Sequence, residues 1–119
     1  MLPRIYFDKN NGFDKDIFMY AEETLLCFQL RRKFKLKIFN VPSSKVIHYE
    51  GVSFIEKTQK QIEIMIDGNR VYFEKAFGVD EFKRYISFMI KYSKLKMIFS
   101  FKHRKQNRLK YLCYKKVKF

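Results

Sequence analysis

The chain has 119 residues, of which 47% are apolar and 18% aromatic, and its formal net charge at pH 7 is +14. This length allows one domain, and so many large apolar side chains exclude an intrinsically disordered chain. No apolar run approaches the roughly 18–20 residues that a membrane-spanning helix needs. The cysteines, Cys27 and Cys113, lie far apart without CxxC spacing, so we expect reduced intracellular thiols and no structural zinc site.

The positive charge is concentrated in the last third of the chain. Residues 1–81 contain all 12 acidic residues and 13 Lys or Arg, whereas residues 82–119 contain 13 Lys or Arg and no acidic residue. A segment of this composition favours binding to phosphates, either on nucleic acid or on an anionic membrane.

The first half of the chain is predicted to mix helix and strand. Residues 1–11 fit either a strand or a short helical turn. From Asp14 to Phe34 apolar residues recur at helical spacing, which predicts a helix with Asp14 as its cap. Residues 35–39 and 45–49 are predicted as strands, joined by a short Pro-Ser-Ser connection into a small sheet element.

The second half is predicted to be mostly helical. One helix is expected from about Phe54 to Phe73, with Ser53 as its cap and Gly68 as a weak point. After Gly78 a further helix is expected, with an apolar stripe of Phe82, Tyr85, Ile86, Met89, Ile90 and Met97. The last eighteen residues are basic with interleaved aromatics. The predicted fold class is therefore α+β.

Two sequence blocks carry a resemblance to a known family. The first reads NNGFDKDIFMYAEETLLCFQL and the second IFNVPSSKVIHYEGVS. Together they resemble the C-terminal, acceptor-side portion of family-2 glycosyltransferases, particularly the rhamnosyltransferase-like enzymes that build bacterial capsule or O-antigen polysaccharides. Those enzymes typically read GGFDE-x-FF-x-Y-x-EDxDLC, then a strand, then VPxAKxxH and GxS. The resemblance covers roughly residues 1–54.

The resemblance implies inverting transfer of a sugar from a nucleotide-sugar donor to an acceptor hydroxyl. In the family a carboxylate takes the hydroxyl proton, which requires an acid within hydrogen-bond reach of the nucleophile. The matching position is Glu23, with Glu22 before it, and Leu25 stands where the family has a second Asp. His48 matches the family histidine near the donor diphosphate or its divalent metal ion, Mg²⁺ or Mn²⁺. Ser53 matches the serine of the GxS motif, and the resemblance implies that it helps to bind the cofactor.

The resemblance also implies an incomplete enzyme. The family's nucleotide-binding half has no counterpart in this sequence, so we expect it to come either from a separate chain acting in trans or from a region upstream of this sequence. The chain would then be a fragment of a GT-A-type fold, in which residues 1–54 form the acceptor-side segment, 55–81 a helical extension and 82–119 a basic amphipathic helix and tail. Alone, it is expected to bind no cofactor and to be inactive.

The basic segment leaves the partner open. Apolar side chains between lysines at 82–119 suit an amphipathic helix on an anionic membrane, which would place the chain in the cytoplasm on the inner face of the cell membrane, near a lipid-linked or glycan acceptor. Less favoured are binding to single-stranded nucleic acid and an exposed solubilising tail. The alternative to a split glycosyltransferase is a non-enzymatic module that binds one of these polyanions.

Overall fold

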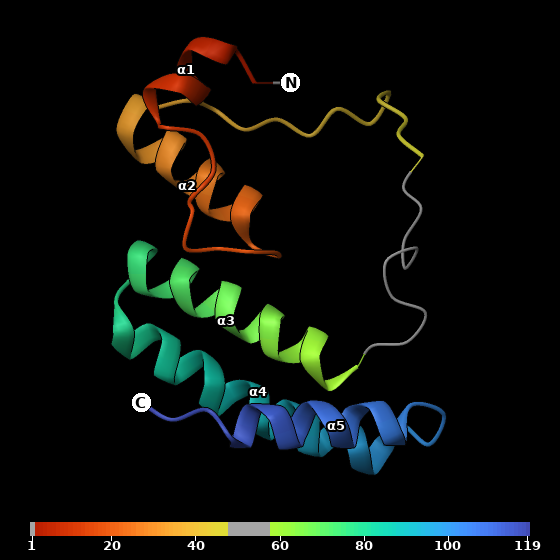
Figure 1. Ribbon diagram of the computed structural model, residues 1–119. Helices are drawn as coiled ribbons and strands as arrows, with labels where there is room; N and C mark the ends of the chain where they lie inside the picture. Colours follow the sequence, from red (N-terminus) through yellow and green to blue (C-terminus); the bar gives the residue numbers. More distant parts are fainter. Residues whose placement is uncertain (1, 48–57) are drawn as a thin grey trace.

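The structure is a computed structural model, and it describes residues 2–47 and 58–119. Within these ranges it contains helices and no strand. Figure 1 shows an N-terminal helical part and, beside it, a bundle of helices that contains the C-terminus. In chain order they are α1 (Arg4–Lys9), α2 (Glu22–Phe34), α3 (Gln59–Ala76), α4 (Val79–Phe99) and α5 (Arg104–Lys115).

The predicted α+β class, and with it the β element of a GT-A-type fragment, is wrong. Residues 35–39 and 45–47 form no strand, and His48 and Tyr49 lie outside the described residues. The segment after α2 first passes beside α1 and then extends away from the helices (Figure 1), and Ile38, Phe39 and Val46 are exposed along it. A strand is stable only when its backbone groups pair with a neighbour, and a lone two-stranded element is marginal in water.

The C-terminal bundle supplies most of the core. Its buried cluster comprises Ile62, Ile66, Phe82, Ile86, Cys113 and Tyr114. The apolar stripes predicted for the second half are confirmed at Ile62 and Ile66 on α3 and at Phe82 and Ile86 on α4. Because α5 adds Cys113 and Tyr114, the basic segment is part of the packed core. No helix in the described part of the chain is long and apolar enough to cross a membrane.

The ends of α3 and α4 follow local sequence signals. Thr58 caps α3: its Oγ1 accepts a hydrogen bond from the backbone N–H of Gln61, and the Gln61 Oε1 accepts one from the Thr58 N–H at 2.9 Å. This capping box satisfies two N–H groups at the start of the helix. The predicted start of this helix, Phe54 with Ser53 as cap, lies outside the described residues. Gly78, at φ 100°, separates α3 from α4.

Helices α1 and α2 with the loop between them form an N-terminal layer. This layer packs on α3 through a second, smaller cluster of buried residues. Ile17 and Leu25 are buried against Val71 of α3, with Phe28 and Tyr72 beside them. The two layers are therefore joined by apolar contacts between residues far apart in the sequence.

Candidate functional site

The candidate site begins where the chain turns into α2. The helix predicted from Asp14 begins only at Glu22, and Asp14 does not cap it. The two residues before it, Tyr20 and Ala21, both have left-handed backbones, with φ of 66° and 70°. Side chains with a Cβ rarely adopt this conformation, because it costs roughly 1 kcal/mol or more at each residue. Two such residues in sequence mark a turn that the surrounding structure holds in place.

The turn before α2 packs closely against α3 because the α3 residue that it contacts is Gly68, which has no side chain. A Cβ atom at position 68 would lie 2.9 Å from the carbonyl oxygen of Met19 and closer still to that of Tyr20. The glycine that weakens α3 in isolation is therefore the contact surface on which the turn before α2 rests. This contact fixes where the first turn of α2, and its acidic residues, lie relative to the bundle.

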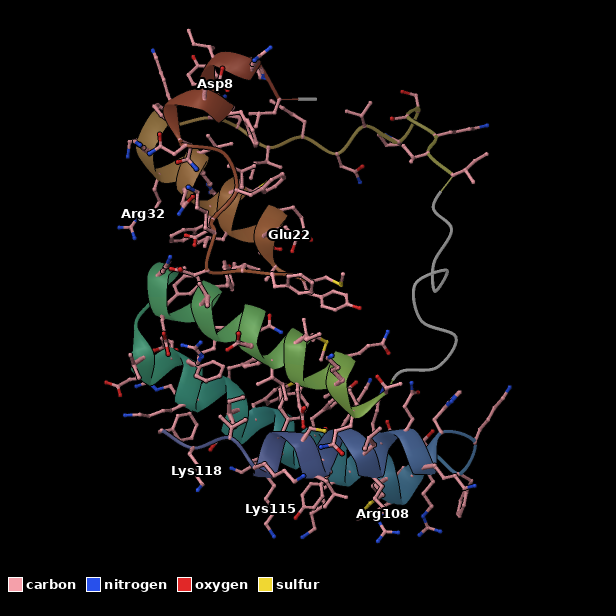
Figure 2. The ribbon with its side chains drawn as sticks, viewed as in Figure 1. Asp8, Glu22, Arg32, Arg108, Lys115 and Lys118 are labelled. Atoms are coloured by element: carbon pink, nitrogen blue, oxygen red, sulfur yellow. The ribbon has the colours of Figure 1, made fainter. Side chains whose placement is uncertain are left out.

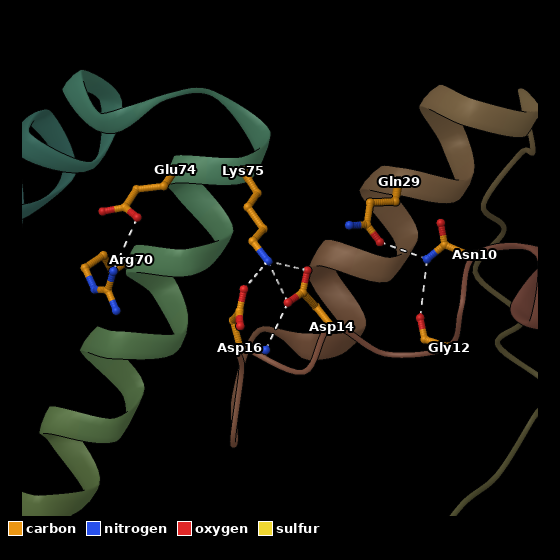
Figure 3. Close-up of polar contacts among 8 residues, drawn as sticks. All are labelled: Asn10, Gly12, Asp14, Asp16, Gln29, Arg70, Glu74 and Lys75. Carbon is orange, nitrogen blue, oxygen red and sulfur yellow. Dashed lines mark hydrogen bonds and ion pairs between the residues drawn. The ribbon is translucent and has the colours of Figure 1, made fainter.

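A second contact pins the loop before this turn to α3 (Figure 3). The Nζ of Lys75 lies 2.8 Å from both carboxylate oxygens of Asp14 and 2.6 Å from Oδ2 of Asp16. The backbone N–H of Asp16 also donates to Asp14 Oδ1 at 3.1 Å. Burial opposes ionisation of Asp14, but the hydrogen bonds from Lys75 and from the Asp16 N–H outweigh it and lower the pKa of Asp14. The same bonds to Asp14 and Asp16 raise the pKa of Lys75.

On the other side, Asn10 ties the chain after α1 to α2. Its side-chain amide donates to Gln29 Oε1 at 2.8 Å and to the carbonyl oxygen of Gly12 at 3.3 Å, as Figure 3 also shows. Gln29 thereby holds the Asn10 side chain where it also bonds to Gly12. The loop between α1 and α2 is thus fastened at both ends.

The two candidate catalytic acids differ in environment. Glu22, labelled at the start of α2 in Figure 2, is partly buried, and its Oε2 is buried without a hydrogen-bond partner among the described residues. Glu23 is exposed and lines a cleft of about 710 Å³. Both carboxylates lie in the first turn, where the positive end of the helix dipole stabilises negative charge.

The cleft beside Glu23 is mainly apolar with a basic rim. Helix α1 and its flanks contribute Phe7 and Phe13, and α2 contributes Leu26, Cys27 and Leu30. Arg31 and the exposed Lys37 also line it, together with Leu36, Ile38, Phe39 and Val41. The sequence indicated Glu23, whereas the basic rim was not foreseen, since Arg31 reads as an ordinary charge near a helix C-terminus. The fold places Arg31 and Lys37 on the lining of the same cleft as Glu23.

The remaining predicted site residues lie outside the described part of the chain. His48, proposed as a metal and diphosphate ligand, and Ser53 are both there, so their relation to Glu23 stays a prediction. Among residues 2–47 and 58–119, no three His, Cys, Asp or Glu side chains gather in a way that would hold a metal ion.

Comparisons with protein-family models, with curated proteins and with solved structures found no match to this chain. The family resemblance described above therefore rests on the two sequence blocks alone.

Proposed function

We propose that this chain is the acceptor-side part of a split glycosyltransferase, which transfers a sugar from a nucleotide-sugar to a lipid-linked or glycan acceptor. The observation that supports this most is the placement of Glu23. The motif acid lies exposed in the first turn of α2, on the wall of a cleft; the turn before it packs on Gly68, and Lys75 holds the loop that precedes this turn. Backbone strain of this kind is common beside functional groups.

In this proposal Glu23 acts as the general base. Its carboxylate takes the proton of the acceptor hydroxyl as the oxygen attacks the anomeric carbon and the nucleoside diphosphate leaves. The apolar lining of the cleft suits the chain or ring faces of an acceptor, and Arg31 and Lys37 at the rim suit its phosphates. Phosphates on the acceptor would fit a lipid-linked sugar. Such an acceptor would place the site on the inner face of the cell membrane.

A nucleotide-binding half in trans would supply the donor, with Mg²⁺ or Mn²⁺ on the diphosphate. By the family resemblance, His48 and Ser53 are the residues of this chain that would contact the donor diphosphate or its metal ion. The described residues offer no clustered metal ligands, so we expect the isolated chain neither to bind nucleotide-sugars tightly nor to transfer sugar. Calorimetry with UDP- and dTDP-sugars plus either metal tests this, and a dissociation constant in the low micromolar range would contradict it.

The decisive experiment is reconstitution. Where the reading frame directly upstream in the genome encodes a nucleotide-binding half, the chain is co-expressed with it, and transfer of labelled sugar to membrane lipid is measured. We expect transfer only when both chains are present, retained activity for Glu23→Asp, and a loss of roughly 10²–10⁴ in kcat for Glu23→Ala. Transfer that is equal in the Ala variant would remove Glu23 from this role, and no transfer with both chains present would refute the split enzyme.

A further inference from the structure

Helix α4 exposes large apolar side chains on the side that faces away from the bundle. The inward side buries Phe82, Ile86 and Ser93. On the outward side of its C-terminal half, exposed residues follow one another at helical spacing. We call this set the α4 apolar face; it comprises Phe88, Tyr92, Leu95, Ile98 and Phe99 on the helix and Phe101 just beyond it. Phe99 and Phe101 are the most open, at 77% and 80% exposure.

Aromatic rings of the α4 apolar face lie against one another and against cations. The rings of Phe88 and Tyr92 stack with their centroids 5.9 Å apart. The Nζ of Lys96 lies 5.0 Å from the centroid of the Tyr92 ring, and the guanidinium of Arg104 lies 5.8 Å from that of Phe101. Lys91 and Lys94 are exposed on the same half of α4, and Lys102 and Lys105 flank Phe101 and Arg104.

The charge around this face has one sign. Residues 82–119 contain no acidic side chain, so every formal side-chain charge that α4 and α5 contribute from residue 82 onward is positive. Figure 2 shows Arg108 and Lys115 of α5, and Lys118 beyond it, projecting away from α3. Two copies of this chain would bring like charges together on contact, whereas a polyanionic surface would be attracted.

We propose that the α4 apolar face is a docking surface for an anionic lipid bilayer, on which α4 lies in the interfacial plane. The cations attract the bilayer, and Phe99, Phe101 and their apolar neighbours insert at the headgroup boundary. Leu95 and Ile98 favour a bilayer over nucleic acid, because aliphatic side chains gain by entering an apolar phase but offer no ring on which a base could stack. The proposal holds whether or not the cleft at Glu23 transfers sugar.

Vesicle binding by the full chain tests the proposal. We use phosphatidylcholine vesicles with and without roughly one third phosphatidylglycerol, at about 0.1 M and about 0.5 M NaCl. We expect co-sedimentation with the anionic vesicles only, weakened but not abolished at the higher salt, where exposed charges are largely screened. Binding that disappears completely at high salt would show charge attraction without insertion and would overturn the proposal.

Paired variants separate this face from exposed apolar residues in general. Phe99→Ser with Phe101→Ser should weaken vesicle binding roughly tenfold or more, because the insertion of two rings is lost. The matched control is Phe18→Ser with Val46→Ser, two apolar side chains outside the bundle that are 83% and 84% exposed, and it should bind as the original chain does. Equal weakening by both pairs would overturn the assignment to α4, and circular dichroism checks that each variant keeps its helices.

A fluorescent probe at the same position gives a second, direct readout. The chain contains no Trp, so Phe99→Trp introduces a single indole. Its emission should shift to shorter wavelength on adding anionic vesicles, and that of Phe18→Trp should stay unchanged. No shift at position 99, combined with a salt-sensitive gel shift of single-stranded RNA at about 0.15 M salt, would identify nucleic acid as the partner and refute the membrane proposal.

Discussion

Replacing Gly68 with Ala tests how the candidate site is attached to the bundle. An ordinary van der Waals contact begins at 3.4 Å, and the new Cβ would lie 2.9 Å from Met19 O and closer to Tyr20 O. The turn before α2 would therefore have to retreat by about 0.5 Å at Met19 and by more at Tyr20. Both atoms belong to backbone, so no side-chain rotation relieves the clash.

Two opposing effects set the size of the change. Alanine is a better helix former than glycine by about 1 kcal/mol, which stabilises α3. Forcing one extra methyl group into a closed contact costs typically 1–3 kcal/mol and occasionally more. Here the neighbour is a turn that already contains Tyr20 and Ala21 with positive φ, so we expect the clash to dominate. The net result should be a destabilisation of up to about 2 kcal/mol.

Thermal and urea unfolding followed by circular dichroism measure this change. In a chain of this size 1 kcal/mol corresponds to roughly 4 °C in Tm. The control is Lys60→Ala, an exposed substitution on the same helix, which should alter stability by less than about 0.5 kcal/mol. A Gly68→Ala protein with a higher Tm than the original chain would show that helix propensity outweighs the contact, and our account of the turn would be refuted.

Three further predictions concern individual polar interactions. Asp14→Asn should lower Tm at about pH 7 and have little effect at about pH 2. The pKa of Asp14 is lower in the folded chain than its unfolded value of 3.8, so its carboxylate contributes stability above 3.8 that is lost as pH falls through the folded pKa. An equal loss of Tm at both pH values would contradict this. Lys75→Met should remove the same pH-dependent difference, as followed by acid titration of ellipticity. Thr58→Ala should cost about 0.5–2 kcal/mol through loss of the α3 cap, with Thr58→Ser as the control that keeps it; urea unfolding measures both.

The helices of the second half could be predicted from sequence because their signals are local. The stripes that contain Ile62, Ile66, Phe82 and Ile86 repeat at the helical period, and backbone hydrogen bonds in a helix are satisfied within the segment itself. The predicted strands were wrong at residues 35–39 and 45–47, because alternation of apolar residues indicates a strand only where a neighbouring strand is present to pair with it.

Contacts between distant residues account for what was missed at the site. The sequence indicated Asp14 as a helix cap, yet its partner Lys75 lies 61 residues away. Gly68 was predicted to be a weak point in the helix because the sequence does not show that the backbone of Met19 and Tyr20 packs against it. That close contact leaves no room for a side chain at position 68. The acid at Glu23 was found through a motif, which is a local pattern, whereas the cleft that Glu23 lines is formed by three segments that only the fold brings together.

The unequal packing of the layers gives the molecule an expected order of folding. Helices α4 and α5 are neighbours in sequence and form the most extensive helix pair. Helices α2 and α3 have a smaller contact, and a much longer segment of chain separates them in sequence. Local contacts form early because they close short loops, so we expect the bundle to form first and the N-terminal layer to dock last. The same layer should open first in the native state, so its amide hydrogens should exchange faster than those of α4.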